Sequence, residues 1–283
     1  MSYKLSKPDD FWEARYHSVE RQGVSGLCVG YEQSKWRQAA FVDYVMEWLP
    51  EFSLNAKERE TLKYSNAVES LRKAAKLVYK TEKFKNRGEF GEIFLHAAVR
   101  SVFNSFPAIS KIYYKSSHNE TVKGFDCVHV VGHLDSLELW IGEVKFYKDI
   151  ARAIRDVVDE IKNHLDIDYL RDEFVLIENK LNNNDKRSDK IKSLISKKRS
   201  MDEIFKQVCI PVLLTYESDV IQNHQSICDD YIKEFNSEIE KYKNRFFDKD
   251  LPDVKIHLFL LPIAEKVNLI KALDSKVKIW RQL

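Results

Sequence analysis

The fold is decided by two stretches, Lys123-Gly-Phe-Asp-Cys-Val-His-Val-Val131 and Leu139-Trp-Ile-Gly-Glu-Val-Lys-Phe-Tyr147. Both are rich in β-branched and aromatic residues, a composition that predicts strands. The segment Gly132-His-Leu-Asp-Ser136 between them has the composition of a turn. The two strands are therefore expected to form a hairpin. Folding it about Leu134 would place position 126 opposite position 142.

Three charged side chains are expected to meet on this hairpin. Glu143 and Lys145 are two residues apart on one strand, so they share a face, and Val144 points to the other. Asp126 falls within one residue of Glu143 on the neighbouring strand. Two carboxylates offer the oxygen ligands of Mg²⁺ or Mn²⁺, and the lysine adds a positive charge beside them. This combination predicts a site for phosphodiester cleavage. The alternatives are a surface ion pair for Glu143 and Lys145, and a turn residue for Asp126.

A third carboxylate is expected from the helix predicted for residues 89–105. This helix is apolar on almost every side, which indicates burial. A charged residue on such a helix needs a partner, and Glu92 is therefore assigned to the site as a metal ligand. Glu89 and His96 lie three residues before it and four after it, so they share its face and are secondary candidates. Two alternatives stay open: an exposed polar stripe for Glu92, and a first-turn acid favoured by the helix dipole for Glu89.

The remaining segments place this site in an α/β fold with a mixed sheet flanked by helices. Residues 1–87 are interpreted as a helical N-terminal region, with helical periods at 36–48 and 65–80. Residues 88–283 form the second unit, with a charged insertion near 165–205 that includes an exposed loop at 182–186. The other elements expected in this unit are strands at 109–114, 210–216 and 254–261 and helices at 148–164, 226–247 and 264–273.

Composition limits the class of protein and its partners. The chain has 283 residues, 44% of them hydrophobic, and a formal net charge of +2, so a nucleic-acid surface must be local. Tyr147 shares the face of Glu143 and Lys145, and with Lys148 and Arg152 it is a candidate contact for a phosphate backbone. The alternative for the two basic residues is a solvated helix face.

Cysteine usage and hydropathy favour a cytoplasmic protein with reduced thiols. The four cysteines are widely spaced and include no CxxC pair, which argues against zinc-ribbon and redox chemistry. The first residues contain no apolar signal core, and no apolar window has the length of a membrane span.

A helix glutamate, a strand aspartate, a Glu-x-Lys strand and a second helix follow one another in residues 88–165. This order resembles the PD-(D/E)xK nuclease superfamily, whose core is restriction-endonuclease-like. The proline of the superfamily name is absent, because Phe125 precedes Asp126. The resemblance implies that Glu92, Asp126, Glu143 and Lys145 are catalytic.

A closer resemblance rests on Arg87-Gly-Glu-Phe-Gly-Glu92, Gly124-Phe-Asp-Cys-Val-His129, Trp140-Ile-Gly-Glu-Val-Lys-Phe-Tyr147 and Ile210-Pro-Val-Leu-Leu-Thr-Tyr216. Together these motifs are similar to those of the HamA family of the Hachiman antiphage defence system. The resemblance implies a Mg²⁺-dependent deoxyribonuclease held and controlled by a helicase subunit, HamB. Two alternatives are kept: a non-catalytic subunit that binds DNA or regulates its partner, and an RNase on the same fold.

Overall fold

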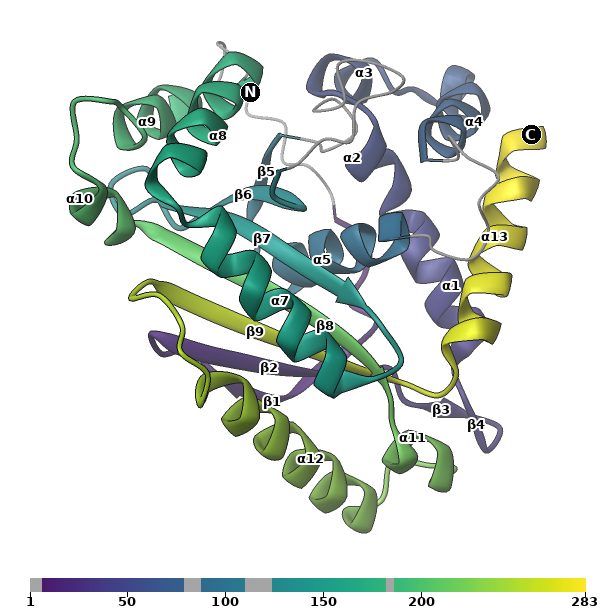
Figure 1. The fold of residues 1–283 in the computed structure, drawn as a ribbon. Coiled ribbons are helices and arrows are strands. Elements are labelled where there is room, and N and C mark those ends of the chain that lie inside the picture. The colour runs from purple at the N-terminus through teal and green to yellow at the C-terminus, as the bar shows by residue number, and fades with distance from the viewer. Residues whose placement is uncertain (1–6, 79–87, 110–123, 182–185) are drawn as a thin grey trace.

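A mixed sheet of seven strands forms the centre of the molecule, in the order β1-β2-β9-β8-β7-β6-β5 (Figure 1). The computed structural model describes residues 7–78, 88–109, 124–181 and 186–283. The strands of the sheet are β1 (Glu13–Ser18), β2 (Gln22–Cys28), β5 (Phe106–Ile109), β6 (Cys127–Val131), β7 (Glu138–Phe146), β8 (Val208–Glu217) and β9 (Lys255–Ile263). A separate pair is formed by β3 (Tyr31–Glu32) and β4 (Lys35–Trp36).

The middle of the sheet is parallel and its edges are antiparallel. Strands β2, β9, β8 and β7 run in the same direction, while β1 pairs antiparallel with β2, and β6 and β5 extend the sheet antiparallel beyond β7. Strand β8 is buried from Val208 to Tyr216. A continuous apolar run such as Ile210–Tyr216 suits this position, because a parallel strand in mid-sheet is covered on both faces.

Helices cover both faces of the sheet (Figure 1). On one face the buried core includes residues of α7 (Ile150–His164), α8 (Ile167–Lys180), α9 (Lys186–Leu194), α10 (Met201–Phe205), α11 (Asp219–Asn223) and α12 (Asp229–Phe247). On the other it includes residues of α1 (Gln38–Glu47), α2 (Leu49–Ser53), α4 (Ala67–Val78), α5 (Gly88–Phe103) and α13 (Lys266–Gln282). Helix α3 (Ala56–Glu60) and the 3₁₀ turn η1 (Tyr64–Asn66) connect α2 to α4.

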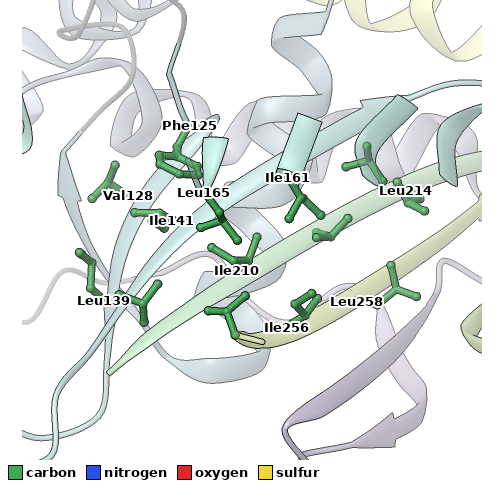
Figure 2. Close-up of a cluster of buried hydrophobic side chains, with 14 of the residues drawn as sticks. Phe125, Val128, Leu139, Ile141, Ile161, Leu165, Ile210, Leu214, Ile256 and Leu258 are labelled. Atoms are coloured by element: carbon green, nitrogen blue, oxygen red, sulfur yellow. The ribbon is translucent and has the colours of Figure 1, made fainter. Parts of the chain in front are cut away.

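Helix α7 is held against the sheet by an apolar stripe. Its buried residues are Ile150, Ala153, Ile154, Val157, Val158 and Ile161. Figure 2 shows Ile161 and Leu165 above side chains of β7, β8 and β9 such as Ile141, Ile210 and Leu258. Each large aliphatic side chain buried in this way contributes about 1.5–3 kcal/mol. This packing fixes the position of α7 over β7, the strand that carries Glu143 and Lys145.

The prediction of an α/β fold with a mixed sheet is confirmed, and the helices expected at 89–105 and 148–164 are α5 and α7. The charged segment 165–205 folds into α8, α9 and α10, whose apolar residues enter the core. Part of the predicted strand 109–114 and most of the predicted loop 182–186 lie outside the described residues. No helix in the described part of the chain is long and apolar enough to span a membrane.

The prediction of a helical N-terminal region is wrong for residues 13–28, which are not helical. These residues form β1 and β2, and β2 pairs in parallel with β9, so the sheet includes segments on both sides of the predicted boundary at residue 87. Trp36, assigned to the first helix, lies in β4, and α1 begins at Gln38. Strand β2 is stabilised by partners more than 200 residues away in the sequence, which a local pattern does not reveal.

Candidate active site

The hairpin of β6 and β7 places Asp126 beside Glu143. Cys127 pairs with Gly142, so the register differs by one residue from the predicted pairing of 126 with 142. The last pair is Val131 with Glu138, so residues 132–137 connect the two strands. The centre of this connection falls between two residues, and not on Leu134 as predicted. Gly132 adopts a φ of 96°, and a Cβ there would lie 2.5 Å from the carbonyl oxygen of Ser136. Position 132 therefore favours glycine, and the observed register places Asp126 opposite Glu143.

Two hydrogen bonds with the backbone of β7 hold Asp126 in place directly before β6. Its amide donates to the carbonyl oxygen of Gly142 at 2.7 Å. Its carboxylate Oδ2 accepts from the amide of Val144 at 2.9 Å. The carboxylate is therefore fixed by the strand that carries the second acid, and one of its oxygens is oriented before any ligand arrives.

Glu143 and Lys145 point toward α7, as their spacing predicts. Glu143 Oε1 lies 2.5 Å from Nδ1 of His164, and Lys145 Nζ donates to Oε2 of Glu160. Val144 points to the opposite face, where a Cβ on Gly91 of α5 would lie 3.0 Å from its methyl carbon. The prediction that the two charged residues share a face and that Val144 occupies the other is confirmed.

Helix α7 and strand β7 run side by side with matching repeats. Four helix residues rise about 6 Å, and two strand residues span about 6.6 Å. Glu160 and His164 are therefore spaced like Lys145 and Glu143, and each acid or base on the helix meets its counterpart on the strand.

The electrostatic environment keeps Lys145 protonated. Burial by itself lowers the pKa of this amine, but the hydrogen bond to Glu160 and the charges of Glu160, Glu143 and Asp126 together raise it above its usual value. The side chain is 15% exposed, while Glu143 is 1% exposed. Lys145 is thus a fixed cation among carboxylates, suited to stabilising negative charge rather than to accepting a proton.

Two residues of this arrangement, Glu160 and His164, are missing from the sequence-based site. The imidazole of His164 stacks on the ring of Tyr169 at 4.7 Å and meets Phe125 edge-on at 5.4 Å, so its orientation is fixed. A signal was present in the sequence. The two polar residues are four apart, on either side of the inward-facing Ile161, in the helix that follows the Glu-x-Lys strand.

Glu92 lies on α5, which packs on the other face of the sheet from α7. It is half-buried and follows Gly91, the residue pressed against Val144 and Phe146. Glu89 is also half-buried and belongs to the first turn of the same helix. Both glutamates are near the start of the helix that contacts β7, and the choice between them stays open.

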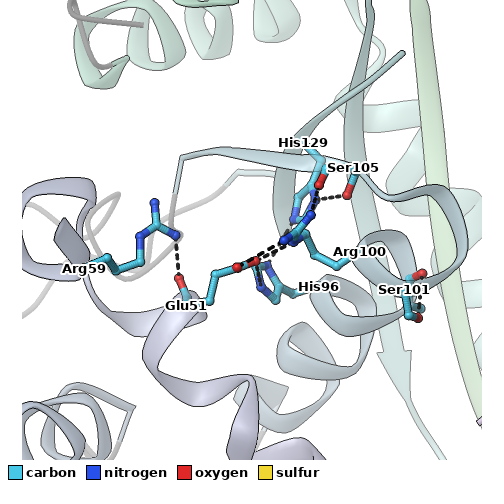
Figure 3. Close-up of polar contacts among 8 residues, drawn as sticks. Glu51, Arg59, His96, Arg100, Ser101, Ser105 and His129 are labelled. Atoms are coloured by element: carbon cyan, nitrogen blue, oxygen red, sulfur yellow. Dashed lines mark hydrogen bonds and ion pairs between the residues drawn. The ribbon is translucent and has the colours of Figure 1, made fainter. Parts of the chain in front are cut away.

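His96, the other secondary candidate, belongs to a separate buried cluster (Figure 3). Its Nδ1 lies 3.2 Å from Nε2 of His129, and its Nε2 lies 3.2 Å from the carboxylate of Glu51. Arg100 Nε donates to the same carboxylate at 2.6 Å, and Ser105 Oγ lies 2.8 Å from Nδ1 of His129. The structure therefore does not bring His96 to Asp126 and Glu143.

The charges of this buried cluster compensate one another. Burial raises the pKa of Glu51, but the hydrogen bond and charge of His96 and those of Arg100 outweigh it and hold the pKa at about 2. Burial lowers the pKa of His96 and of His129. Arg100 is thus the lasting counter-charge of Glu51, and the cluster ties α2 to α5.

The sequence matches the HamA family model over residues 8–277. The chain belongs to the HamA family. It is also 24% identical, over 257 residues, to Anti-bacteriophage protein A of Escherichia coli (strain K12). That alignment covers 88% of this chain and 46% of the relative, so the chain spans about half the length of the curated protein it matches. The family resemblance inferred from the motifs is confirmed.

The HamA-family match runs from before β1 into α13, so it includes the whole seven-stranded sheet. Within the described residues, no three His, Cys, Asp or Glu side chains already surround one point as a metal site. Asp126 and Glu143 offer two carboxylates on one face. Mg²⁺ is commonly held by one or two carboxylates together with waters and substrate phosphates. The donors present fit a hard cation that a substrate helps to hold.

The predicted phosphate contacts lie just beyond Lys145, at the carboxyl end of β7. The guanidinium of Arg152 sits 5.2 Å from the centre of the Tyr147 ring. Lys148 is exposed between them in the sequence. Against the raising effect of desolvation, hydrogen bonds from Arg155, Arg152 and Tyr147 lower the pKa of Asp156. Tyr147 therefore contacts α7 at Asp156, one helical turn before Glu160.

Proposed function

We propose that this HamA-family chain is a metal-dependent nuclease that cleaves DNA phosphodiesters as the effector of an antiphage defence complex. The observation that carries the proposal is the convergence of Asp126, Glu143 and Lys145 on one face of the β6–β7 hairpin. The relative named Anti-bacteriophage protein A supports the defence role. The resemblance to the HamA family supports control by a helicase subunit, HamB.

The order of elements supports a PD-(D/E)xK-like core. Helix α5 precedes the three antiparallel strands β5, β6 and β7, and α7 then leads the chain back toward β8, which lies parallel to β7. This is the helix–strand–strand–strand–helix order that the sequence resemblance implies. Asp126 and Glu143 occupy the acidic positions of the motif, and Lys145 the basic one.

The proposed mechanism assigns a role to each residue of the chain. Asp126 and Glu143 would hold Mg²⁺ or Mn²⁺, with Glu92 or Glu89 as a third carboxylate. When bound, the cation polarises the scissile phosphate and lowers the pKa of a bound water. Lys145 stabilises the negative charge that develops on the phosphate.

Glu160 and His164 are positioning residues in this mechanism. His164 Nδ1 lies 2.5 Å from Oε1 of Glu143 and so fixes the orientation of this carboxylate. Glu160 holds the ammonium of Lys145 near Glu143 and Asp126 and keeps it charged. Lysine suits this role as a compact point charge.

One observation favours the second candidate function, a non-catalytic subunit that binds DNA or regulates its partner. Glu143 is almost completely buried, and Lys145 is already paired with a carboxylate. An ion-paired lysine between strand and helix would also arise if these charges only held α7 in place. An RNase on the same fold is distinguished from a deoxyribonuclease by substrate alone.

Nicking of supercoiled plasmid tests the proposal. The chain is incubated with plasmid in Mg²⁺, in Mn²⁺ and in EDTA, with and without a HamB helicase. A labelled RNA of matched sequence serves as the second substrate. We expect metal-dependent nicking of DNA that the helicase controls. Glu143→Gln is the test variant at the site, and Glu240→Gln on the exposed surface of α12 is its matched control. Equal nicking by both variants, or none under any condition, would contradict the proposal.

A further inference from the structure

The segments that follow the neighbouring parallel strands β8 and β9 go to opposite faces of the sheet. After β8 it continues into α11 and α12, whose apolar residues pack on the same face as α7. After β9 it continues into α13, whose apolar residues pack on the face of α5. In α/β sheets, ligands bind outside the carboxyl ends of the strands at such a switch point. In this chain that place lies between Glu217 and Lys266.

Three cations gather at this end of the sheet. Lys266, the first residue of α13, places Nζ 4.9 Å from the centre of the Phe146 ring and 5.7 Å from that of Tyr147. Arg152 covers the same Tyr147 ring. Burial, together with the charges of Arg152 and Lys148, lowers the pKa of Lys266 despite Glu217. The three positive charges are therefore close enough to repel one another.

The local chain geometry fixes this arrangement. Thr215 Oγ1 donates to the carbonyl oxygen of Tyr147 at 2.9 Å, and the amide of Glu217 donates to that of Lys148 at 3.0 Å. The residues that follow β7 are thus bonded to the end of β8. The backbone of Lys148 is therefore held beside the switch point, and its exposed side chain starts from a fixed position.

The acids nearby are engaged by helix amides or by arginines. Glu217 Oε1 accepts from the amide of Lys266 at 2.9 Å, and Asp149 Oδ1 accepts from that of Arg152 at 2.6 Å. Asp156 pairs with the guanidinium groups of Arg152 and Arg155. Among the described residues, no carboxylate lies within ion-pair distance of the ammonium of Lys266 or Lys148. The ammonium groups of Lys266 and Lys148 therefore remain for an anionic ligand.

The distance from the candidate active site fits a nucleic-acid backbone. Tyr147 directly follows the last residue of β7 and is two positions after Lys145, and two residues of extended chain span about 6.6 Å. This is comparable to the spacing between adjacent phosphates of one nucleic-acid strand. A strand with its scissile phosphate at Lys145 would bring the next phosphate to Tyr147 and Lys266.

We propose that Lys266, with Lys148 and Arg152, binds the backbone phosphate next to the scissile one, and that the ring of Tyr147 separates the two phosphate positions. This inference rests on the proposed function, because it places a nucleic-acid strand across Lys145. It adds Lys266, a residue 121 positions from Lys145 in the sequence, as the principal phosphate contact outside the catalytic group. A lysine–phosphate contact positions the strand and carries no base sequence information.

Salt-dependent binding tests this site without requiring cleavage. Glu143→Gln serves as the background, EDTA removes divalent metal, and fluorescent duplex DNA, single-stranded DNA and RNA of one sequence are the probes. Affinity is measured across a range of salt concentrations. Lys266→Gln is expected to weaken binding and to reduce the slope of log K against log salt by about 0.9 for a duplex and about 0.7 for a single strand, the value for one lost phosphate contact.

Lys271→Gln is the matched control, because it removes the same charge from an exposed position of the same helix. Lys266→Arg restores a cation and is expected to restore the slope. Lys148→Gln tests the site through an exposed residue, in case Lys266→Gln lowers the thermal unfolding temperature. The proposal is overturned if the background protein binds none of the probes. It is also overturned if Lys266→Gln and Lys148→Gln both match Lys271→Gln.

The two proposals fail in different ways. If the wild-type chain cleaves no nucleic acid but Lys266→Gln still reduces the salt slope, the nuclease function is wrong and the phosphate site stands. If the wild-type chain cleaves DNA and Lys266→Gln binds as tightly as Lys271→Gln, the phosphate site is wrong and the nuclease function stands.

Discussion

The molecule contains two groups of histidines, acids and bases on opposite faces of one sheet, and they differ in how their charges balance. The cluster around Glu51 pairs its carboxylate with Arg100, and burial lowers the pKa of both of its histidines. On the α7 face, Asp126, Glu143 and Glu160 surround the one ammonium group of Lys145. The charges of the first group are balanced by its own members, and we call it the closed cluster. The second group has an excess of negative charge that attracts a cation.

This difference separates structural from functional chemistry more clearly than residue type does. Both groups include a histidine in contact with a buried glutamate, and both join a helix to another element. The charged groups of the Glu51 cluster pair with one another. The α7 face combines fixed carboxylate oxygens with a held cation, an arrangement suited to a metal ion and a phosphate.

The sharpest test of the comparison removes the charges of the candidate site. Glu143→Gln combined with Lys145→Met should reduce cleavage by at least about 10²–10³-fold, because a lost charge stabiliser alone has an effect of that size. The fold should persist, since the partner acid Glu160 is 32% exposed and can be solvated. Nicking rates and thermal unfolding of the double variant are measured together. A fully active double variant would remove the central claim.

Breaking the closed cluster should affect stability instead. Arg100→Met leaves the buried carboxylate of Glu51 without its counter-charge, which typically costs about 3–5 kcal/mol. Denaturant unfolding measures the loss. Arg245→Met, an exposed arginine on α12, is the control and should change the free energy of unfolding by no more than about 0.5 kcal/mol. Similar values for both variants would show that the cluster does not hold the fold.

The helix carboxylate can be identified by metal titration. Glu92→Gln should raise the Mg²⁺ concentration for half-maximal nicking by about tenfold or more, the effect of losing a supporting group at a metal site. Glu89→Gln should leave it unchanged. The reverse result would assign the role to Glu89, and equal titrations for both variants and wild type would exclude α5 from the site.

The closed cluster should also make stability depend on pH. Burial lowers the pKa of His129 in the folded protein, so the unfolded chain takes up the proton first as pH falls below about 6.5. The free energy of unfolding should therefore decrease by about 1.4 kcal/mol per pH unit for each such histidine. The slope is measured between pH 6.5 and 5 for wild type and His129→Gln. Parallel slopes would show that His129 is not held neutral.

The smallest effect is expected for Glu160→Gln. The hydrogen bond and charge of Glu160 raise the pKa of Lys145, whereas burial lowers it. Without Glu160 the ammonium should lose its proton at lower pH, so the alkaline limb of the nicking profile should shift downward while the rate at neutral pH changes little. Asp159→Asn, an exposed neighbour on the same helix, is the control. An unshifted alkaline limb would mean that Lys145 does not need its charge.

The elements that were predicted from the sequence are those with strong local patterns. Helices α5 and α7, strand β8 and the β6–β7 hairpin all have apolar runs or alternations that identify them. Strand β2 was not predicted, because Gln22–Cys28 contains two glycines and a serine and becomes a strand only between β1 and β9. The hairpin register was missed by one residue because the composition of the turn does not give the length of the connection.

The candidate site was predicted only as far as spacing within one element determines it. Glu143 and Lys145 share a face because of the two-residue repeat of a strand. Glu160 and His164 required knowledge that α7 packs along β7 with matching repeats, which is a tertiary fact. His96 was included because spacing shows which residues share a helix face. Spacing does not show what that face meets, which here is the Glu51 cluster.

The pairing of β2 with β9 determines when the protein can fold during its synthesis. Residues 22–26 leave the ribosome early, but their parallel partners are residues 256–260. An isolated pair such as β1 and β2 is at best marginally stable in water. Long-range parallel pairing is intrinsically slow because the connecting loop must first be closed. The sheet is therefore completed only after β9 has been synthesised, and a chain stopped before β9 would leave an edge of β2 unpaired and open to aggregation.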